Sequence, residues 1–466
     1  MIDRRSFLKT LGAAAVLSRS SAWTYAQGRA DGWSQLPEIL ARIKPPTFPS
    51  RDFDVRAFGA VGNNTTDNTE ALRNAVAACA RGGGGRVVVP AGEFLTGAIE
   101  LKSGVNLHVT ADATIRFTRD LTRYPLVLTR FEGVELMNFS PFIYAFEQTN
   151  VAVTGNGTID GNADCTHWWP WKGRTECGWK TGDANQDPDR NRLFDMSERG
   201  VPVRDRVFGP GHYLRPNFIQ PYRCINVLIE GVKLRNSPMW QVHPALCTNV
   251  TVRGVDIQVP AGSPNTDGCD PESCRDVLIE DCFFDTGDDC IAIKAGRNAD
   301  GRRVKIASEN IVIRRCHMKN GHGAITIGSE ASAGVRNVFA EQCQLDSPQL
   351  DIAVRIKNNA MRGNVIENVF VRDLEIGQVA QAVLGIDYYY EEADKGRFTP
   401  IVRHVVIERV QARRAQYALN LRGFANAPIR DVSLIDCAFD GVAKPNVVEH
   451  VEGLSLRNVR INGKPS

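Results

Sequence analysis

The sequence predicts an all-β chain that folds as a parallel β-helix, and three observations lead to this prediction. A short phrase, in which Asn, Asp or His precedes β-branched and aliphatic residues, recurs every 23 to 36 residues and begins at Asn226, Asn249, Asp276, Asn310, Asn337, Asn368, His404 and Asp431. Repeats at such intervals are typical of solenoids. Each copy is short and β-branched, which favours a strand opened by a turn residue. No stretch between the copies keeps a 3.6-residue period, so helical repeats are excluded.

The length of the chain fits the same architecture. At 466 residues it exceeds the size at which most chains divide into several domains. A solenoid escapes this limit because each coil packs only on its neighbours. We therefore expect one β-helix domain over residues 51–466, preceded by a polar, proline-bearing lead-in over residues 27–50.

The first coil of a solenoid needs a cap, and residues 67–79 predict a helix that provides it. Asp67 is the expected N-cap residue, and Glu70 stands three positions later, as in a capping box. The glycine run from Gly82 to Gly85 ends this helix. No Gly-Lys-Ser/Thr follows the run, so it is not a phosphate-binding loop.

Residues 1–26 are predicted to be an export signal. Arg4 and Arg5 form a twin-arginine pair, and a modest apolar stretch from Leu11 to Leu17 follows. This stretch is far shorter than the roughly 20 apolar residues of a membrane span. We therefore expect export by the twin-arginine route, to the periplasm or the extracellular space.

The charge of the chain narrows the choice of partners. The formal net charge is +3, and removal of residues 1–26 takes away four positive charges and one negative charge, which leaves about zero. An acidic partner must therefore be attracted by a local cluster of cations. No basic stripe indicates nucleic-acid binding. We expect a monomer with no membrane span.

The twelve cysteines are expected to be mostly reduced core residues. Four of them close the same strand phrase, namely Cys282, Cys316, Cys343 and Cys437. At such positions a thiol serves as a small apolar side chain. Two pairs, Cys165–Cys177 and Cys269–Cys274, remain candidates for disulfides. No zinc-type cluster is present.

A long segment, residues 163–215, interrupts the repeat. It carries four of the seven tryptophans, namely Trp168, Trp169, Trp171 and Trp179. Long insertions in solenoids commonly form loops on the binding face. Aromatic rings can stack on sugars, and arginines can bind carboxylates. The alternative is a small satellite core beneath a long loop, and both interpretations stay open.

Four short strings of polar residues lie at intervals that match the coils. They are Asn265-Thr266-Asp267, Gly287-Asp288-Asp289-Cys290, Gly321-His322-Gly323 and Arg355-Ile356-Lys357. Neighbouring strands stack about 4.8 Å apart, so the strings would meet on one face within about 15 Å. Asp288 and Asp289 would point to opposite faces of a regular strand, so a bend after Gly287 is needed to bring both into one cleft. Repulsion among three carboxylates should raise the pKa of at least one.

Paired carboxylates beside a cationic patch suit acid–base cleavage of an anionic sugar polymer. A stack of turn aspartates or a calcium site is the alternative. His322 and the cations Arg355 and Lys357 favour the catalytic interpretation, with no metal and no cofactor. We expect these two cations to lack a permanent carboxylate partner and to await an anion from the substrate.

The residues of the four strings and their order resemble the motifs of glycoside hydrolase family 28, the polygalacturonase family. The signature of that family runs Asn-Thr-Asp, Asp-Asp, Gly-His-Gly and Arg-Ile-Lys. The resemblance covers most of the chain from about Phe53. It implies a right-handed parallel β-helix, a pectic polysaccharide or oligogalacturonide as substrate, and cleavage with inversion at the anomeric carbon without a metal.

The resemblance also implies the catalytic roles. Asp288 matches the general acid that protonates the glycosidic oxygen, and Asp267 and Asp289 match the pair that activates water. His322 would hold the acid in its working ionisation state.

Four further positions match substrate-binding residues of the family. Arg355 and Lys357 would bind the galacturonate carboxylate, and Asn265 would contact the substrate or support the site. Gly323 would let the substrate approach closely.

The chain departs from the simple endo-acting pattern in two places. Gly287 precedes the two aspartates, and an insertion over residues 297–303 separates them from His322. Added loops can close one end of a cleft, so we expect exo-action on chain ends. Rhamnogalacturonan and xylogalacturonan remain open as substrates. A calcium-dependent pectate lyase and a non-catalytic carbohydrate-binding β-helix are the rival interpretations.

Overall fold

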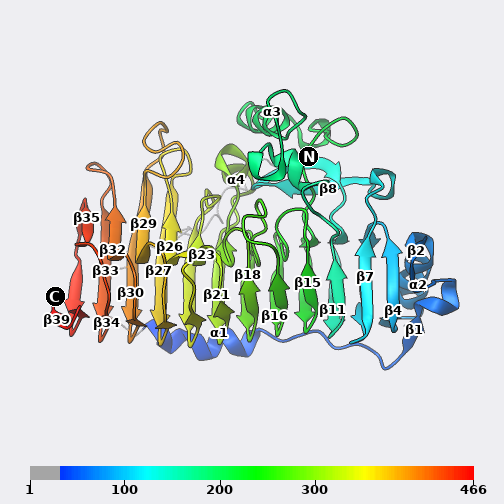
Figure 1. Cartoon of the computed structure of the whole chain (residues 1–466), viewed down its shortest axis with the longest axis horizontal. Helices are drawn as coiled ribbons and strands as arrows, with labels where there is room; N and C mark the ends of the chain where they lie inside the picture. The colour runs from blue at the N-terminus through cyan, green and yellow to red at the C-terminus, as the bar shows by residue number, and fades with distance from the viewer. Residues whose placement is uncertain (1–31) are drawn as a thin grey trace, which may run out of the picture.

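The computed structural model describes residues 32–466, and these residues form a right-handed parallel β-helix, as predicted (Figure 1). Each complete coil visits three parallel sheets in turn, named sheets A, B and C below. The export signal proposed for residues 1–26 lies outside the described residues. None of the helices within residues 32–466 is long and apolar enough to cross a membrane.

Sheet A contains the repeated phrase of the sequence. Its strands are β1 (Asp52–Asp54), β3 (Gly85–Val89), β6 (Val105–Val109), β11 (Thr149–Gly155), β14 (Ile225–Glu230), β16 (Thr248–Arg253), β18 (Arg275–Glu280), β21 (Ser308–Arg314), β24 (Val335–Glu341), β27 (Asn364–Arg372), β30 (Pro400–Glu408), β33 (Ile429–Ile435), β36 (Val451–Glu452) and β37 (Ser455–Arg457).

Sheet B follows sheet A in each coil. Its strands are β2 (Asn63–Asp67), β4 (Gly92–Thr96), β7 (Ala113–Phe117), β12 (Thr158–Asp160), β15 (Lys233–Arg235), β17 (Asp256–Gln258), β19 (Phe283–Asp285), β22 (His317–Met318), β25 (Gln344–Leu345), β28 (Glu375–Ile376), β31 (Gln411–Ala412), β34 (Ala438–Phe439), β38 (Arg460–Ile461) and β39 (Lys464–Pro465).

Sheet C has two parts, which isolated bridges through Val242 and Cys269 join. Its strands are β5 (Ile99–Glu100), β10 (Ile143–Phe146), β13 (Ile219–Tyr222), β20 (Ile291–Ile293), β23 (Gly321–Ile327), β26 (Leu350–Lys357), β29 (Ala382–Asp387), β32 (Tyr417–Arg422) and β35 (Val447–Glu449).

The register of sheet A explains why the phrase recurs. Val227, Val250, Val277 and Ile311 stack on one another in successive coils, and all four are buried. The residue before each such position adopts a left-handed conformation, which Asn and Asp tolerate better than most residues. Its side chain often hydrogen-bonds to the next coil, as Asn310 does to Asp276 at 2.9 Å.

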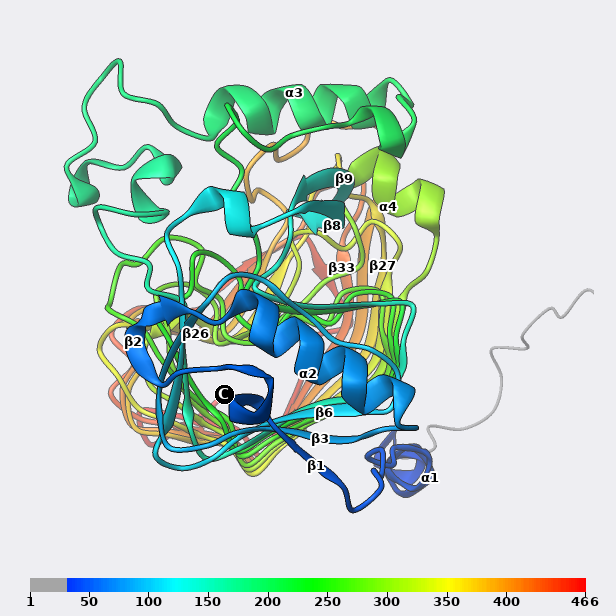
Figure 2. The same cartoon turned by 90° about the vertical axis from the view of Figure 1, so that its right-hand side faces the viewer.

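Helix α2 (Thr69–Arg81) covers the open end of the first coil, as predicted (Figure 2). Its N-cap is Asn68 rather than Asp67, so the predicted capping residue is wrong by one position. The buried side chain of Asn68 is engaged with the backbone of Val61 and Leu95, and Asp67 instead accepts a 2.9 Å hydrogen bond from the Thr69 amide. The helix ends at Gly82 as expected.

The lead-in is partly helical. After the 3₁₀ turn η1 (Gly32–Gln35), helix α1 (Leu36–Arg42) lies along the outer face of sheet A (Figure 2). Leu36 and Ile39 pack there against Val312 and Phe339. Short 3₁₀ turns η2 (Val55–Phe58) and η3 (Leu121–Arg123) complete the first coils.

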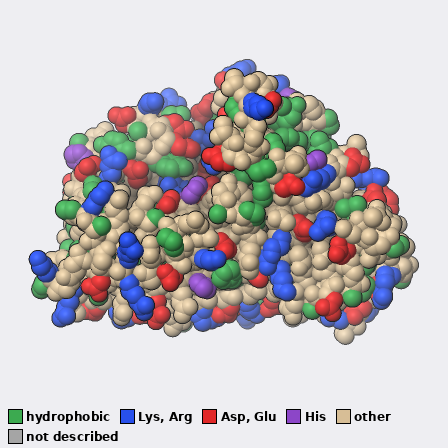
Figure 3. All heavy atoms as spheres, viewed as in Figure 1, with side chains coloured by type: hydrophobic (Ala, Val, Ile, Leu, Met, Phe, Trp, Pro, Cys, Tyr) green, Lys and Arg blue, Asp and Glu red, His purple; other side chains and the backbone are tan. Residues whose placement is uncertain are grey.

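A projection rises beside the helix axis over the middle coils (Figures 1 and 3). It combines the antiparallel hairpin β8 (Leu126–Phe131) and β9 (Val134–Phe139) with the segment between β12 and β13, which holds η4 (Trp169–Lys172), η5 (Thr175–Cys177), α3 (Asp187–Glu198) and η6 (Val203–Asp205). Helix α3 packs on the hairpin in a satellite core that includes Leu136 and Leu193. Trp168 and Trp169 are buried in the main core, so the structural interpretation applies to these two tryptophans.

The cysteines are mostly reduced, as expected. Ten of the twelve are free and buried. Cys165 and Cys177 form a disulfide inside the insertion, whereas Cys269 and Cys274 remain separate thiols.

Candidate functional site

The four strings lie on neighbouring coils of sheet C, as predicted. Asn265 and Asp267 lie between β17 and β18, and Asp288 and Asp289 lie between β19 and β20. His322 is on β23, and Arg355 and Lys357 are on β26. Cys269, Ile291, Ile325 and Val354 align from coil to coil, which sets the register of the site.

Gly287 produces the bend that brings both aspartates into the site. A β-carbon at this position would lie 2.7 Å from Oγ1 of Thr266, so only glycine fits beside the neighbouring coil. The chain bends at Gly287 and Asp288 before strand β20 begins. Asp288 and Asp289 consequently line one pocket instead of pointing to opposite faces.

The three carboxylates form one cluster, in which one oxygen from each lies within 4.8 Å of the others. Asp289 accepts a 2.7 Å hydrogen bond from Nζ of Lys357, and Arg355 lies 3.4 Å from its other oxygen. Asp288 Oδ1 lies 2.9 Å from Nδ1 of His322. The expectation that Arg355 and Lys357 lack a carboxylate partner is therefore wrong, because the bend at Gly287 places Asp289 directly against them.

The electrostatics of the cluster differ from residue to residue. Burial raises the pKa of Asp267 well above its usual range, and the charges of Asp288 and Asp270 raise it further. Burial would also raise the pKa of Asp288, but the hydrogen bond and charge of His322 lower it below its usual range. The same hydrogen bond raises the pKa of His322. The predicted rise falls on Asp267, while Asp288 and His322 form an ion pair.

Gly323 serves the packing of the site itself. A β-carbon there would lie 2.9 Å from Oδ1 of Asp289 and 3.2 Å from Cδ of Arg355, so a side chain would separate these two residues. The oxygen of Asp289 also accepts a 3.1 Å hydrogen bond from Thr326. The absence of a side chain at Gly323 thus keeps the carboxylate and its cation together.

Asn265 connects the site to the insertion. It adopts a left-handed conformation, and its Oδ1 accepts a 2.7 Å hydrogen bond from Arg215. Arg215 is fully buried, and its other acceptors are Gln186 and two backbone carbonyls. Asn265 also lines the pocket of the carboxylates.

The pocket also contains residues that lie outside the four strings and that the sequence did not identify. Lys294 lies 3.8 Å from Asp267 and 3.2 Å from Glu330, and its ammonium group lies over the ring of Trp240. Tyr390 follows strand β29, and its ring centre lies 5.2 Å from Nζ of Lys357. No periodic pattern marks these residues, although Lys294 could have been found as a charged residue that ends an apolar strand.

The cluster also has the spacing of a cation site, but its surroundings fit a metal poorly. Calcium takes six to eight oxygen ligands. Here Lys357, Lys294 and His322 each lie beside one of the three carboxylates, at 2.7, 3.8 and 2.9 Å. A metal ion would have to compete with these three cationic groups.

Comparisons with known proteins agree with this geometry. The model of "Glycosyl hydrolases family 28" matches residues 211–453. The crystal structure of a hyperthermoactive exopolygalacturonase from Thermotoga maritima superposes with a TM-score of 0.90 at 45% identity, over 93% of this chain and 97% of that chain. A probable polygalacturonase of Vitis vinifera is 28% identical over 415 residues, which cover 85% of this chain and 77% of that protein.

A third relative, the exo-poly-alpha-D-galacturonosidase of Dickeya chrysanthemi, is 26% identical over 366 residues, which cover 74% of this chain and 59% of that protein. The family match spans more than half of the chain and includes all four strings. This chain belongs to family 28 of the glycosyl hydrolases.

Proposed function

We propose that this glycoside hydrolase cleaves the α-1,4-galacturonosidic linkages of pectin and acts from the ends of the chains. The observation that carries the proposal is the cluster of Asp267, Asp288 and Asp289 in a pocket that also contains several cations. The carboxylates suit acid–base hydrolysis of a glycosidic bond, and the cations suit an acidic sugar. The 45% identity to an exopolygalacturonase over nearly the whole chain supports the same activity.

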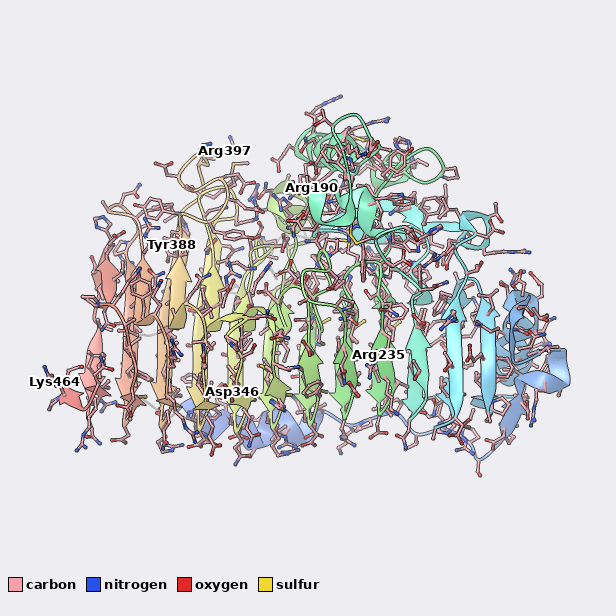
Figure 4. The ribbon with its side chains drawn as sticks, viewed as in Figure 1. Arg190, Arg235, Asp346, Tyr388, Arg397 and Lys464 are labelled. Atoms are coloured by element: carbon pink, nitrogen blue, oxygen red, sulfur yellow. A yellow bond between two sulfur atoms is a disulfide. The ribbon has the colours of Figure 1, made fainter. Side chains whose placement is uncertain are left out.

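The walls of the pocket support action on chain ends. Arg190 of α3 and Glu132 of the hairpin line the pocket from the projection, which therefore forms one wall. Arg190 is labelled in Figure 4. Arg297, which begins the insertion before β21, binds Glu330 at 3.3 Å and Glu391 at 3.2 Å, and both acids line the pocket. Loops that are joined by such ion pairs restrict the passage of a long polymer through the site more than an open groove would.

In the proposed mechanism, Asp288 protonates the glycosidic oxygen. Because its pKa is lowered, Asp288 holds no proton of its own at neutral pH. His322, whose pKa is raised by the same contact, supplies the proton through the 2.9 Å hydrogen bond. The pair therefore acts as a single acid.

Asp289 and Asp267 are proposed to activate the attacking water. Asp289 is held by Lys357 at 2.7 Å and by Arg355 at 3.4 Å, which fixes its carboxylate in the pocket as the acceptor for the proton of the water. Asp267 has a raised pKa, so it is suited to orient the water rather than to act as the main base. Its Oδ1 has no hydrogen-bond partner within residues 32–466 and is available to that water.

Product analysis tests the proposal. The protein should release monomeric galacturonate from polygalacturonate as its early product and should keep full activity in excess EDTA. A ladder of oligomers would show endo-cleavage. An unsaturated product that absorbs ultraviolet light, with activity lost in chelator and restored by calcium, would show a lyase. Binding without new reducing ends would show a carbohydrate-binding protein.

The proposed site of action is outside the cytoplasm. The twin-arginine pair at Arg4 and Arg5 supports export, and ten buried free thiols are compatible with folding in a reducing compartment before transport. A fractionation experiment with wild-type protein and an Arg4→Lys/Arg5→Lys variant tests this, and the variant should accumulate in the cytoplasm. Sedimentation of the purified protein tests the proposed monomeric state.

A further inference from the structure

The insertion brings an excess of positive charge to the pocket. Lys172, Arg174 and Arg190 line it from the projection, with Glu132 as the carboxylate beside them. Glu132 is already bound to Arg190 at 2.7 Å. Arg215 lies behind this wall, and its hydrogen bonds within residues 32–466 go to neutral oxygens of side-chain amides and backbone carbonyls. This side of the pocket therefore holds more cations than carboxylates.

Lys172 and Arg174 differ from Arg190, which is paired with Glu132. Neither side chain makes a hydrogen bond or an ion pair with any residue in the described part of the chain, 32–466. Lys172 is half-buried, and burial lowers its pKa; the charge of Glu132, which is already paired with Arg190, offsets this only in part. A half-buried ammonium group that shares its nearest carboxylate with another cation is unfavourable, so the position is explained best by an anion that binds there.

The segment that carries these cations is held in place. Trp171 packs edge-on against Trp168 and Tyr213, with ring centres 4.8 and 5.4 Å apart. The carbonyl of Trp171 accepts a 2.6 Å hydrogen bond from the amide of Gln186. The disulfide between Cys165 and Cys177 closes the loop around it. Lys172 thus stands at the end of the fixed turn η4, which suits selective binding.

A further cation of the pocket, Arg355, lies on strand β26, which follows the carboxylates in the order of the coils, whereas the insertion precedes them. Arg355 is bound to Asp289 and to the carbonyl of His322 through a single nitrogen, Nη1, so its remaining donors are available to a ligand. Exposure differs across the pocket, since the side chains of Lys294 and Glu330 are 3% and 8% exposed, whereas that of His322 is 44% exposed. The pocket is therefore closed at Lys294 and Glu330 and opens to solvent at His322.

We propose that Lys172 and Arg174 bind the carboxylate of the terminal, non-reducing galacturonate, in addition to the carboxylate of the next ring, which the family resemblance assigns to Arg355, so that the enzyme favours a uronic acid on both sides of the bond it cleaves. This inference rests on the proposed exo-hydrolase function. It selects homogalacturonan as the substrate. In rhamnogalacturonan every second ring is neutral, so one of the two cationic positions would face a ring without a carboxylate.

Kinetics on three substrates test the assignment. Trigalacturonate carries both carboxylates, p-nitrophenyl α-galacturonide carries only that of the terminal ring, and p-nitrophenyl α-galactoside carries none. Lys172→Met should lower kcat/KM about 10- to 100-fold on the first two substrates, which is the effect of one charge-assisted hydrogen bond. On the neutral galactoside the variant should equal the wild type. Lys180→Met is the matched control, because Lys180 is exposed in the same insertion and is not among the residues that line the pocket.

The outcomes separate this inference from the proposed function. Equal losses on charged and neutral substrates, or no loss at all, would overturn the role of Lys172. A wild-type protein that releases no galacturonate from trigalacturonate would instead overturn the proposed function. If Lys172→Met does not fold, as judged by circular dichroism, Arg174→Gln provides the same comparison at an exposed position. Hydrolysis of rhamnogalacturonan at a rate similar to that of homogalacturonan would also contradict the inference.

Discussion

The ammonium group of Lys357 lies 2.7 Å from Oδ2 of Asp289, and both side chains are almost fully buried. This contact shows how the site reduces the repulsion between carboxylates that lie close together. Asp289 is held by Lys357, and Asp288 is held by His322, so the two adjacent carboxylates have separate cationic partners. The contact also changes what a substitution of Lys357 should do.

Replacing Lys357 with methionine should destabilise the protein. Breaking a buried ion pair by removing one partner costs about 3–5 kcal/mol, since the remaining charge is left without a counter-ion. Urea denaturation of Lys357→Met should show this loss, and activity should fall on charged and neutral substrates alike. The double variant Lys357→Met/Asp289→Asn should recover much of the stability. A double variant no more stable than Lys357→Met would contradict this account.

Asp288→Asn should lower kcat by about 10²- to 10⁴-fold on polygalacturonate, because the proton donor to the glycosidic oxygen is lost while the shape of the side chain is kept. The variant should remain folded, as judged by circular dichroism, although it loses the stability that the ion pair with His322 contributes. Asp346→Asn is the control, because Asp346 is exposed on the body of the β-helix, away from the projection (Figure 4). Full activity in a folded Asp288→Asn protein would remove this residue from the mechanism.

The ion pair of His322 and Asp288 should be visible in a titration. The carboxylate raises the pKa of His322 above its ordinary value of 6.5, so Asp288→Asn should lower that pKa again. NMR of the imidazole ring measures this directly, with His322→Gln used to assign the signal. An unchanged pKa in Asp288→Asn would mean that the contact is weak in solution.

The same pair should make stability depend on pH. The raised pKa of His322 gives a contribution that is full below about pH 6.5 and is lost as the pH rises through the higher, folded-state pKa. The lowered pKa of Asp288 gives a contribution that is present above about pH 4 and is lost as the pH falls through the folded-state value. The stability difference between the wild type and Asp288→Asn should therefore be largest between about pH 4 and 6.5, as measured by denaturation at several pH values.

The stereochemistry of the product should show whether the carboxylates act only as acid and base or whether one of them acts as a nucleophile. The nearest oxygens lie within 4.8 Å, whereas carboxyl groups in inverting glycosidases are typically about 6.5–9.5 Å apart. We nevertheless expect inversion, because Asp267 has a raised pKa and Asp289 is bound by two cations, so neither is a free nucleophile. Proton NMR of the first product should show the β-anomer of galacturonate. An initial α-anomer would indicate a covalent intermediate.

Asn310→Ala should lower the free energy of unfolding by about 1–3 kcal/mol. Asn310 donates to Asp276 at 2.9 Å and accepts from Asn337 at 3.1 Å, and its φ of 59° is unfavourable for alanine. Asn310→Gly removes the same hydrogen bonds but tolerates the backbone conformation. Denaturation should find the glycine variant more stable than the alanine variant; the opposite order would contradict the conformational argument.

The sequence by itself determined the β-helix and the meeting of the four strings. Both follow from register, because a strand repeat fixes which residues stack in neighbouring coils. Val227 stacks on Val250 in sheet A, and Ile325 stacks on Val354 in the strands that carry His322 and Arg355. The sequence also indicated the bend at Gly287 from the alternation of side chains along a strand.

Only the tertiary structure decided which charges meet. Lys357 contacts Asp289 across 68 residues, and Lys172 reaches the pocket from an insertion that has no repeat. Helix α1 likewise packs on sheet A through contacts with strands more than 200 residues away in sequence, as the 3.1 Å hydrogen bond from Arg42 to Asp276 shows. Such contacts depend on how long loops fold back over the coils, and no period in the sequence encodes that path.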